Sequence, residues 1–177
     1  MKQEDVVKFI NYDKDTGKIF WIKRRSSFFK TEHSCKSWNT RYSGKEITTI
    51  DGKGYRVLSI LGKRYLAHRL AWLYVKGEWP NVIDHINGDR LDNRFANLRN
   101  VTNQQNHMNC KMAVNNTSGA TGVYKNKVRN IWCAQMKFNG VTYHLGSSRN
   151  FEDAVRMRKE EEIKLGFSDR HGENNAK

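Results

Sequence analysis

The sequence predicts an α+β protein in which two small domains each combine short antiparallel strands with helices. Three observations support this prediction: turn-separated apolar stretches typical of strands, one stretch with helical periodicity near the middle of the chain, and an Asn-Gly turn between two apolar runs further on. A chain of 177 residues can hold two cores, because a domain of about 50 residues is near the lower limit for burying enough apolar surface.

The first domain is predicted to span residues 1–107 and to begin with antiparallel strands. Short strands are expected at 18–22, 54–61 and 64–66, where apolar runs are bounded by turn residues. Residues 23–45 are basic and polar with scattered aromatic side chains and no clear period, which predicts a loop.

A helix is predicted over residues 67–76. Leu70, Leu73 and Tyr74 fall at positions i, i+3 and i+4, and Gly77 is well placed to end the helix. After it, residues 81–106 predict the order strand, loop, strand, helix.

The elements of that order have local signals. The first strand ends near His85, a loop rich in Asn, Asp and Gly follows, and residues 97–101 form the second strand. Thr102 is suited to cap a helix that runs through Asn106. Residues 108–117 show no period and are predicted to be a linker between the domains.

The second domain is predicted to span residues 118–170 as three strands and a helix. Asn139-Gly140 separates two apolar runs, and this dipeptide is the strongest short-range signal for a two-residue hairpin turn. Asn150 can cap a following helix, with Gly166 as its stop. Residues 171–177 are predicted to be a disordered tail.

The composition indicates a polyanionic partner. Lys and Arg number 32 against 18 Asp and Glu, which gives a formal charge of +14 and a pI near 9.8. No window approaches the roughly 20 apolar residues of a membrane span, and the first residues lack the apolar core of a signal peptide. We therefore expect an intracellular, cytoplasmic protein without a membrane partner.

The cysteines support neither a disulfide framework nor a cysteine-ligated zinc site. There are three of them, widely spaced and never in a C-x-x-C pair. We expect ordinary thiols in a reducing compartment.

Residues 82–106 concentrate Asp, Asn and His side chains of the kind that phosphodiester hydrolysis needs. Asp84 and Asn106 offer oxygen ligands for one hard divalent cation, Mg²⁺ or Mn²⁺, and His85 is the obvious base for a water molecule. Adjacent residues on a regular strand point to opposite faces. A bulge or a strand end at Asp84-His85 is therefore required if both are to serve one site.

Residues 54–106 resemble the HNH nucleases of the phage homing-endonuclease type. The stretches that carry the resemblance are Ala67-His-Arg-Leu-Ala-Trp72, Val82-Ile-Asp-His-Ile-Asn-Gly-Asp89, Asp92-Asn93, and Asn97-Leu-Arg-Asn-Val-Thr102 followed by Asn106. The resemblance implies a ββα-metal nuclease domain that cuts double-stranded DNA in a phage-infected host.

The resemblance also implies roles for individual residues. Asp84 and Asn106 would bind one divalent metal ion, His85 would activate the water, and Asn97 would hold the loop between the strands. The family often has His at the last position, and His107 stands beside Asn106, so it could assist or replace that ligand.

Other residues of this region have two readings. His68 and Arg69 are candidates for phosphate contacts, with helix packing an equal alternative for His68. Asp89, Asp92 and Asn93 are most simply turn formers. Arg24 and Arg25, in the basic segment, are further candidates for DNA contacts.

The second domain resembles the plant Apetala-2/ethylene-response-factor (AP2/ERF) DNA-binding domain, which lays a three-stranded sheet in the major groove. The resemblance rests on Ser118-Gly-Ala-Thr-Gly-Val123, Trp132-Cys-Ala-Gln-Met-Lys137, His144-Leu-Gly146 and Phe151-Glu-Asp-Ala154. The matching outward positions are Tyr124, Asn126, Gln135, Lys137, Thr142 and His144. The plant pattern favours Arg and Trp at several of them, so base preference does not carry over, and a merely solvated sheet face is the alternative.

These patterns favour a site-directed endonuclease of the homing type that acts as a monomer or weak dimer without a small-molecule cofactor. The competing hypothesis is a sequence-specific DNA-binding regulator with a degenerate HNH motif. An RNA-binding protein is a weaker third reading, because no aromatic RNA-stacking signature is present.

Overall fold

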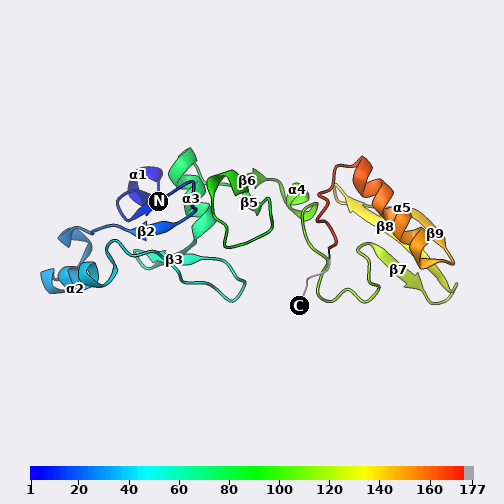
Figure 1. Ribbon diagram of the computed structural model, residues 1–177, viewed down its shortest axis with the longest axis horizontal. Coiled ribbons are helices and arrows are strands. Elements are labelled where there is room, and N and C mark those ends of the chain that lie inside the picture. Colours follow the sequence, from blue (N-terminus) through cyan, green and yellow to red (C-terminus); the bar gives the residue numbers. More distant parts are fainter. Residues whose placement is uncertain (174–177) are drawn as a thin grey trace. The chain divides into compact units, whose positions relative to one another are not determined.

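The computed structural model describes residues 1–173. The chain divides into two compact units, Met1–Val101 and Thr102–Lys177, and Figure 1 shows the elements of each unit along the chain. The predicted domain limits near residues 107 and 118 remain a prediction. No helix formed by residues 1–173 is long and apolar enough to cross a membrane.

The N-terminal unit contains three separate two-stranded antiparallel sheets: β1 with β2, β3 with β4, and β5 with β6. Its elements are α1 (Gln3–Val6), β1 (Ile10–Tyr12), β2 (Ile19–Trp21), η1 (Ser26–Phe28), α2 (Glu32–Tyr42), β3 (Val57–Ile60), β4 (Lys63–Leu66), α3 (Ala67–Lys76), β5 (Val82–His85), η2 (Phe95–Asn97) and β6 (Leu98–Val101).

Helix α3 contributes several side chains to the core of this unit. Its residues Leu70 and Leu73 are almost fully buried, in one apolar cluster with Ile10, Ile19 and Ile60 from the strands. The helix ends at Gly77, whose φ of +78° is left-handed and whose N–H donates to the Leu73 carbonyl. The predicted helix and its stop are therefore confirmed.

The prediction of a loop over residues 23–45 was wrong for α2. Thr31 caps this helix by accepting a hydrogen bond from the Ser34 N–H. Cys35 is the only residue of α2 that is buried. The helix therefore has no apolar stripe, which explains why periodicity did not indicate it.

The C-terminal unit is a three-stranded antiparallel sheet in the order β7-β8-β9, covered by one long helix (Figure 1). Its elements are α4 (Asn103–His107), β7 (Val123–Asn126), β8 (Ile131–Phe138), β9 (Val141–Ser148) and α5 (Phe151–Lys164). This architecture matches the predicted one.

The hairpin between β8 and β9 turns at Asn139 and Gly140, with φ values of +50° and +82°. Two consecutive positive φ values are those of the expected primed turn. Where α5 packs on the sheet, Ala134 and Ala154 are fully buried. Small side chains at these positions let α5 approach the sheet closely.

The predicted linker contacts both the end of the predicted second domain and the start of the predicted disordered tail. Ser168 N–H donates to the Met108 carbonyl, and Gly172 N–H donates to that of Cys110. The prediction of disorder was therefore wrong for residues 171–173, and residues 174–177 lie outside the described part of the chain.

The physical reason lies on α5, where Glu162 is buried. A buried carboxylate needs cations around it. Arg158 lies 3.2 Å and Lys159 lies 2.9 Å from its oxygens, and His171 Nε2 lies 3.5 Å away. The His171 side chain thus packs into a polar cluster with Glu162 and Arg158.

Candidate active site

Asp84 and His85 end strand β5, which pairs with β6 in a continuous antiparallel register. Asp84 lies opposite Arg99, and His85 lies opposite Leu98. His85 is the last residue of β5, and a site shared with Asp84 stays a prediction. Asp84 and His85 are 7% and 5% exposed, so their polar atoms depend on neighbours within the protein.

The neighbour of Asp84 is Arg99, a residue that the sequence did not single out. Asp84 Oδ2 accepts a hydrogen bond from Arg99 Nε at 2.8 Å and forms an ion pair with Nη2 at 2.7 Å. The pairing follows from register, since residues directly opposite each other on antiparallel strands share a face. The guanidinium brings positive charge next to the Asp84 side chain.

Asn93 orients the His85 ring. His85 Nε2 lies 3.2 Å from Asn93 Oδ1, while Asn93 Nδ2 donates to the Leu91 carbonyl at 3.4 Å. An amide oxygen can only accept, so a neutral His85 carries its proton on Nε2, and Nδ1 has the lone pair. The interpretation of Asn93 as a simple turn former was therefore incomplete.

Asn93 is itself held by the N-terminal hairpin. It is 1% exposed, and its carbonyl accepts a hydrogen bond from the Tyr12 hydroxyl at 2.7 Å. A Cβ at Gly17 would collide with the backbone of Asn93 and Arg94, so the turn between β1 and β2 needs glycine there. The hairpin is thus part of the support of His85.

Burial lowers the pKa of His85 below its ordinary value of 6.5, and the hydrogen bond to Asn93 and the nearby Asp84 oppose this shift. The ring is therefore neutral at neutral pH, as a proton acceptor must be.

His68 packs edge-on against the His85 ring at 5.0 Å. Burial, followed by the charges of His85 and Arg69, lowers the pKa of His68 to about 3. His68 is 5% exposed, and its ring centroid lies 5.2 Å from that of Tyr55. A neutral buried ring favours the packing role over a phosphate contact.

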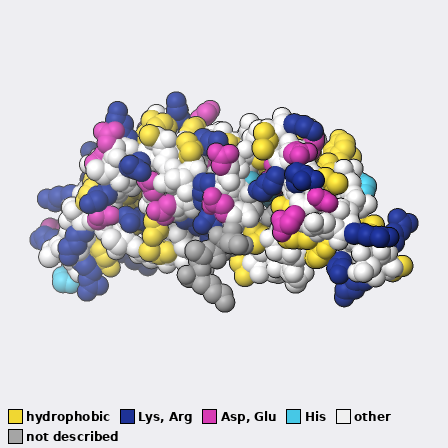
Figure 2. Space-filling view, turned by 45° about the vertical axis from the view of Figure 1, so that its right-hand side comes forward, with side chains coloured by type: hydrophobic (Ala, Val, Ile, Leu, Met, Phe, Trp, Pro, Cys, Tyr) yellow, Lys and Arg dark blue, Asp and Glu magenta, His cyan; other side chains and the backbone are white. Residues whose placement is uncertain are grey.

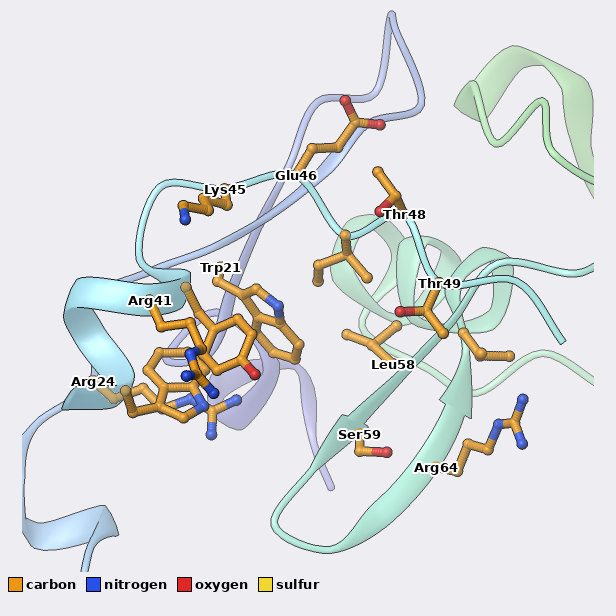
Figure 3. A pocket seen from close by; sticks show the side chains of 14 residues that line it. Trp21, Arg24, Arg41, Lys45, Glu46, Thr48, Thr49, Leu58, Ser59 and Arg64 are labelled. Atoms are coloured by element: carbon orange, nitrogen blue, oxygen red, sulfur yellow. The ribbon is translucent and has the colours of Figure 1, made fainter. Parts of the chain in front are cut away.

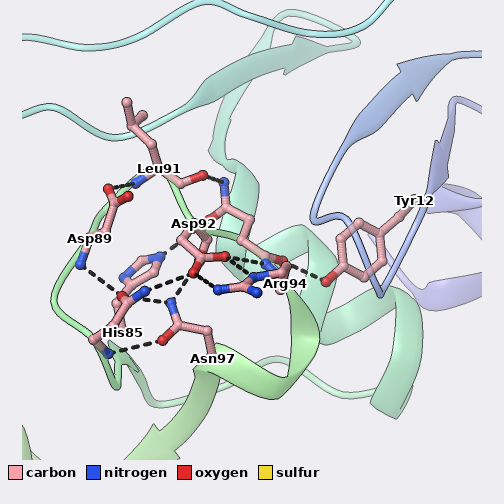
Figure 4. A network of polar contacts seen from close by, with 9 residues as sticks. Tyr12, His85, Asp89, Leu91, Asp92, Arg94 and Asn97 are labelled. Atoms are coloured by element: carbon pink, nitrogen blue, oxygen red, sulfur yellow. Dashed lines mark hydrogen bonds and ion pairs between the residues drawn. The ribbon is translucent and has the colours of Figure 1, made fainter.

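The loop between the two strands is held by Asn97 and Asp92, as Figure 4 shows. Asn97 Oδ1 accepts from the Asn87 N–H at 2.9 Å, and Asn97 Nδ2 donates to the Asp92 carbonyl at 2.8 Å. Hydrogen bonds from Arg94 lower the pKa of Asp92 to about 2, so this carboxylate is ionised. These contacts are those that a loop-holding role of Asn97 requires.

The arginine candidates have different surroundings. Arg69 donates to the carbonyls of Pro80 and Asn81 at 2.8 and 2.9 Å, which ties α3 to the residues before β5. Arg24 is stacked among aromatic rings, whereas Arg25 is exposed.

The outer face of the C-terminal sheet carries exposed polar pairs. Gln135 lies opposite His144, and Lys137 lies opposite Thr142, and all four side chains are exposed. Of the two remaining predicted positions, Tyr124 is 42% exposed. Asn126 accepts hydrogen bonds from two N–H groups of the following turn.

The candidate metal ligands Asp84 and Asn106 belong to different units. Asn106 lies on α4, which Thr102 and Gln105 cap through a reciprocal capping box, and His107 beside it is exposed. Within residues 1–173 no group of three or more His, Cys, Asp or Glu side chains is arranged to hold a metal ion. Carboxylate and amide oxygens are ligands that Mg²⁺ and Mn²⁺ prefer, and Mg²⁺ usually keeps several waters. Asp84 in the first unit and Asn106 in the second each carry a side-chain oxygen of this kind.

Comparison with known proteins identifies the region that carries this site. The model of the HNH endonuclease family matches residues 65–108. An uncharacterized HNH endonuclease, L560, of Acanthamoeba polyphaga mimivirus is 31% identical over 106 residues, which are 59% of this chain and 54% of the viral protein. The chain thus spans about half the length of that relative.

Protein 3.8 of Escherichia phage T7 is 32% identical over 82 residues, which are 45% of this chain and 68% of the phage protein. No solved structure matches the chain significantly. The chain contains an HNH endonuclease domain. It belongs to the same family as protein 3.8 of phage T7.

Proposed function

We propose that this protein is a metal-dependent DNA endonuclease in which His85 is the general base. The observation that carries the proposal is the buried His85 at the end of β5, with Nε2 directed at Asn93 so that Nδ1 has the lone pair. This residue lies within the segment that matches the HNH endonuclease family.

In the proposed reaction, His85 Nδ1 takes a proton from a water molecule whose oxygen attacks the phosphorus of a DNA phosphodiester. The bond from phosphorus to the leaving oxygen breaks, and that oxygen takes a proton from solvent. Asp84 and Asn106 would hold a divalent cation, which would supply positive charge to the phosphate. The ββα-metal arrangement of the family, with His107 as the alternative ligand to Asn106, is part of this proposal.

We further propose that the C-terminal sheet is the DNA-reading module of a homing-type enzyme, in the manner of an AP2/ERF domain. Support comes from its exposed face, where Gln135 and Lys137 stand beside His144 and Thr142. Lys and Arg side chains are also spread over the surface in Figure 2, with carboxylates among them. Such a surface suits a polyanion.

The test of the nuclease function is incubation of the purified full chain with supercoiled plasmid and with linear genomic DNA. Parallel reactions contain Mg²⁺, Mn²⁺ or a chelator. Cleavage with either metal and none with the chelator is expected. DNA binding without cleavage under every metal condition would favour the regulator hypothesis.

The rate of cleavage should rise with pH through a pKa below 6.5 and then stay level. The sign follows from the lowered pKa of His85, since the ring accepts a proton only above that pKa. The measurement is kcat/KM on plasmid at saturating metal across the pH range. A rise centred above 6.5 would contradict the assigned environment of His85.

Replacing Gln135 by Ala should reduce discrimination between target and random duplex by about 5- to 150-fold, the equivalent of about 1 to 3 kcal/mol, if this side chain reads a base. The measurement is competition binding at fixed salt. Ser147→Ala, an exposed change on β9, is the control. Equal weakening of both duplexes would assign Gln135 to the phosphate backbone instead.

A further inference from the structure

A hollow of about 830 Å³ opens in the N-terminal unit (Figure 3), and its lining includes none of the residues of the candidate active site. Its walls come from β2, α2, the extended residues 45–49, and the hairpin of β3 and β4. The aromatic side chains in its wall are Trp21, Trp38 and Tyr42. Trp38 contacts both of the others, with ring centroids 5.6 and 5.2 Å apart.

Arg24 lines this hollow with its charge only partly compensated. Its guanidinium carbon lies 3.8 Å from the Trp38 ring centroid and 4.8 Å from that of Trp21. Nε and Nη2 are buried and have no hydrogen-bond partner among the described residues. Cation–π contacts offset part of the free-energy cost of removing the Arg24 guanidinium from water. The guanidinium still attracts an anion.

The backbone around Arg24 is rigidly placed. Asn39 on α2 accepts a hydrogen bond from the Arg24 N–H at 2.8 Å and donates one to its carbonyl at 2.9 Å. The Asn39 amide therefore pairs with both backbone groups of Arg24, as the backbone of a neighbouring strand would. The stack of Arg24 on Trp38 is thus built before any ligand arrives.

The rim of the hollow is cationic. Arg41, Lys45 and Arg64 line it together with Arg24, against the single carboxylate of Glu46. That carboxylate is already paired with Arg56 and Lys18. Exposed aliphatic hydroxyl groups in the lining come from Thr48, Thr49 and Ser59.

We propose that this hollow binds one unstacked nucleotide of DNA. The base would stack on the aromatic wall, and its phosphates would contact the cationic rim. A phosphate alone needs no aromatic wall, and an apolar molecule needs no cations, whereas a nucleotide uses both. The volume is that of a pocket for one such group. The inference rests on DNA being the substrate of the proposed nuclease.

The test measures oligonucleotide binding by the full chain carrying His85→Ala, so that the result does not depend on cleavage. Fluorescence anisotropy compares a single-stranded oligodeoxythymidylate with an oligonucleotide of equal length and charge in which every base is absent. The base-bearing strand should bind about 5- to 100-fold more tightly, as expected for aromatic stacking of a base.

Matched variants locate the effect. Trp38→Ala should abolish the preference for the base-bearing strand, and Trp79→Ala should preserve it, since Trp79 stacks on Tyr65 outside the hollow. Arg41→Ala should weaken both strands more than Lys30→Ala does, because Lys30 is exposed outside the lining. If circular dichroism shows that Trp38→Ala is unfolded, Tyr42→Ala, on a ring 38% exposed, serves the same purpose.

Two duplexes distinguish the sources of the nucleotide. A duplex with one mismatched pair that binds more tightly than its fully paired counterpart indicates extrusion from the helix, and equal binding indicates a single strand as the source. Equal binding of base-bearing and base-free strands by the chain with Trp38 intact would overturn the inference. So would a preference that survives Trp38→Ala. Plasmid that stays uncut by wild-type chain would instead overturn the nuclease function.

Discussion

Replacing His85 by Ala is expected to reduce DNA cleavage by about 10²- to 10⁴-fold, which is the usual contribution of general-base catalysis. The side chain ends β5 with Nε2 directed at Asn93, and the alanine leaves no group to take the proton of water. DNA binding should be nearly unchanged. The measurements are single-turnover cleavage of plasmid and the dissociation constant for duplex DNA.

His33→Ala is the matched control for that variant. His33 is an exposed histidine on α2. The His33→Ala variant should therefore cleave DNA at the wild-type rate. Near-normal cleavage by His85→Ala would remove His85 as the base. Loss of DNA binding together with cleavage would point to a folding defect, which circular dichroism would reveal.

Asn93 should separate positioning of the base from catalysis itself. Asn93→Leu keeps the approximate size but removes the acceptor for His85 Nε2, so the ring loses the partner that sets its tautomer. We expect kcat to fall by about 10- to 100-fold, by analogy with the loss of a group that orients a metal-ligating histidine. KM should change little, because Asn93 is buried.

Asn93→Asp is the conservative partner of this experiment. A carboxylate still accepts from His85 Nε2, but its charge stabilises the protonated ring and raises the pKa of His85. Cleavage should therefore recover at high pH, and the rising limb of the pH profile should move upward. If both variants lose the same activity at every pH, Asn93 serves only the packing of the loop.

Local signals in the sequence predicted much of the architecture. The periodicity of residues 67–76 with Gly77, and the Asn139-Gly140 turn, are short-range features that do not depend on distant contacts. Helix α5 begins after Asn150, whose side chain accepts from the Glu152 N–H as a cap should. Each of these elements was found where it was predicted.

The same kind of reasoning failed where no apolar stripe marks the structure. Helix α2 buries only Cys35, so its residues resemble a loop in composition. His171 was predicted to lie in a disordered tail, because chain ends are usually disordered. Its burial depends on Glu162, which lies nine positions earlier and is buried with Arg158.

By itself the sequence determined which residue types could support phosphodiester hydrolysis, since His85 and Asp84 stand in a pattern that few other functions use. Only the tertiary structure decided how they are held. The register of β5 with β6 sets Arg99 opposite Asp84, and the close approach of Gly17 to Asn93 supports the partner of His85. Both are long-range contacts, set by strand register and packing, and no short window of sequence encodes such a pairing.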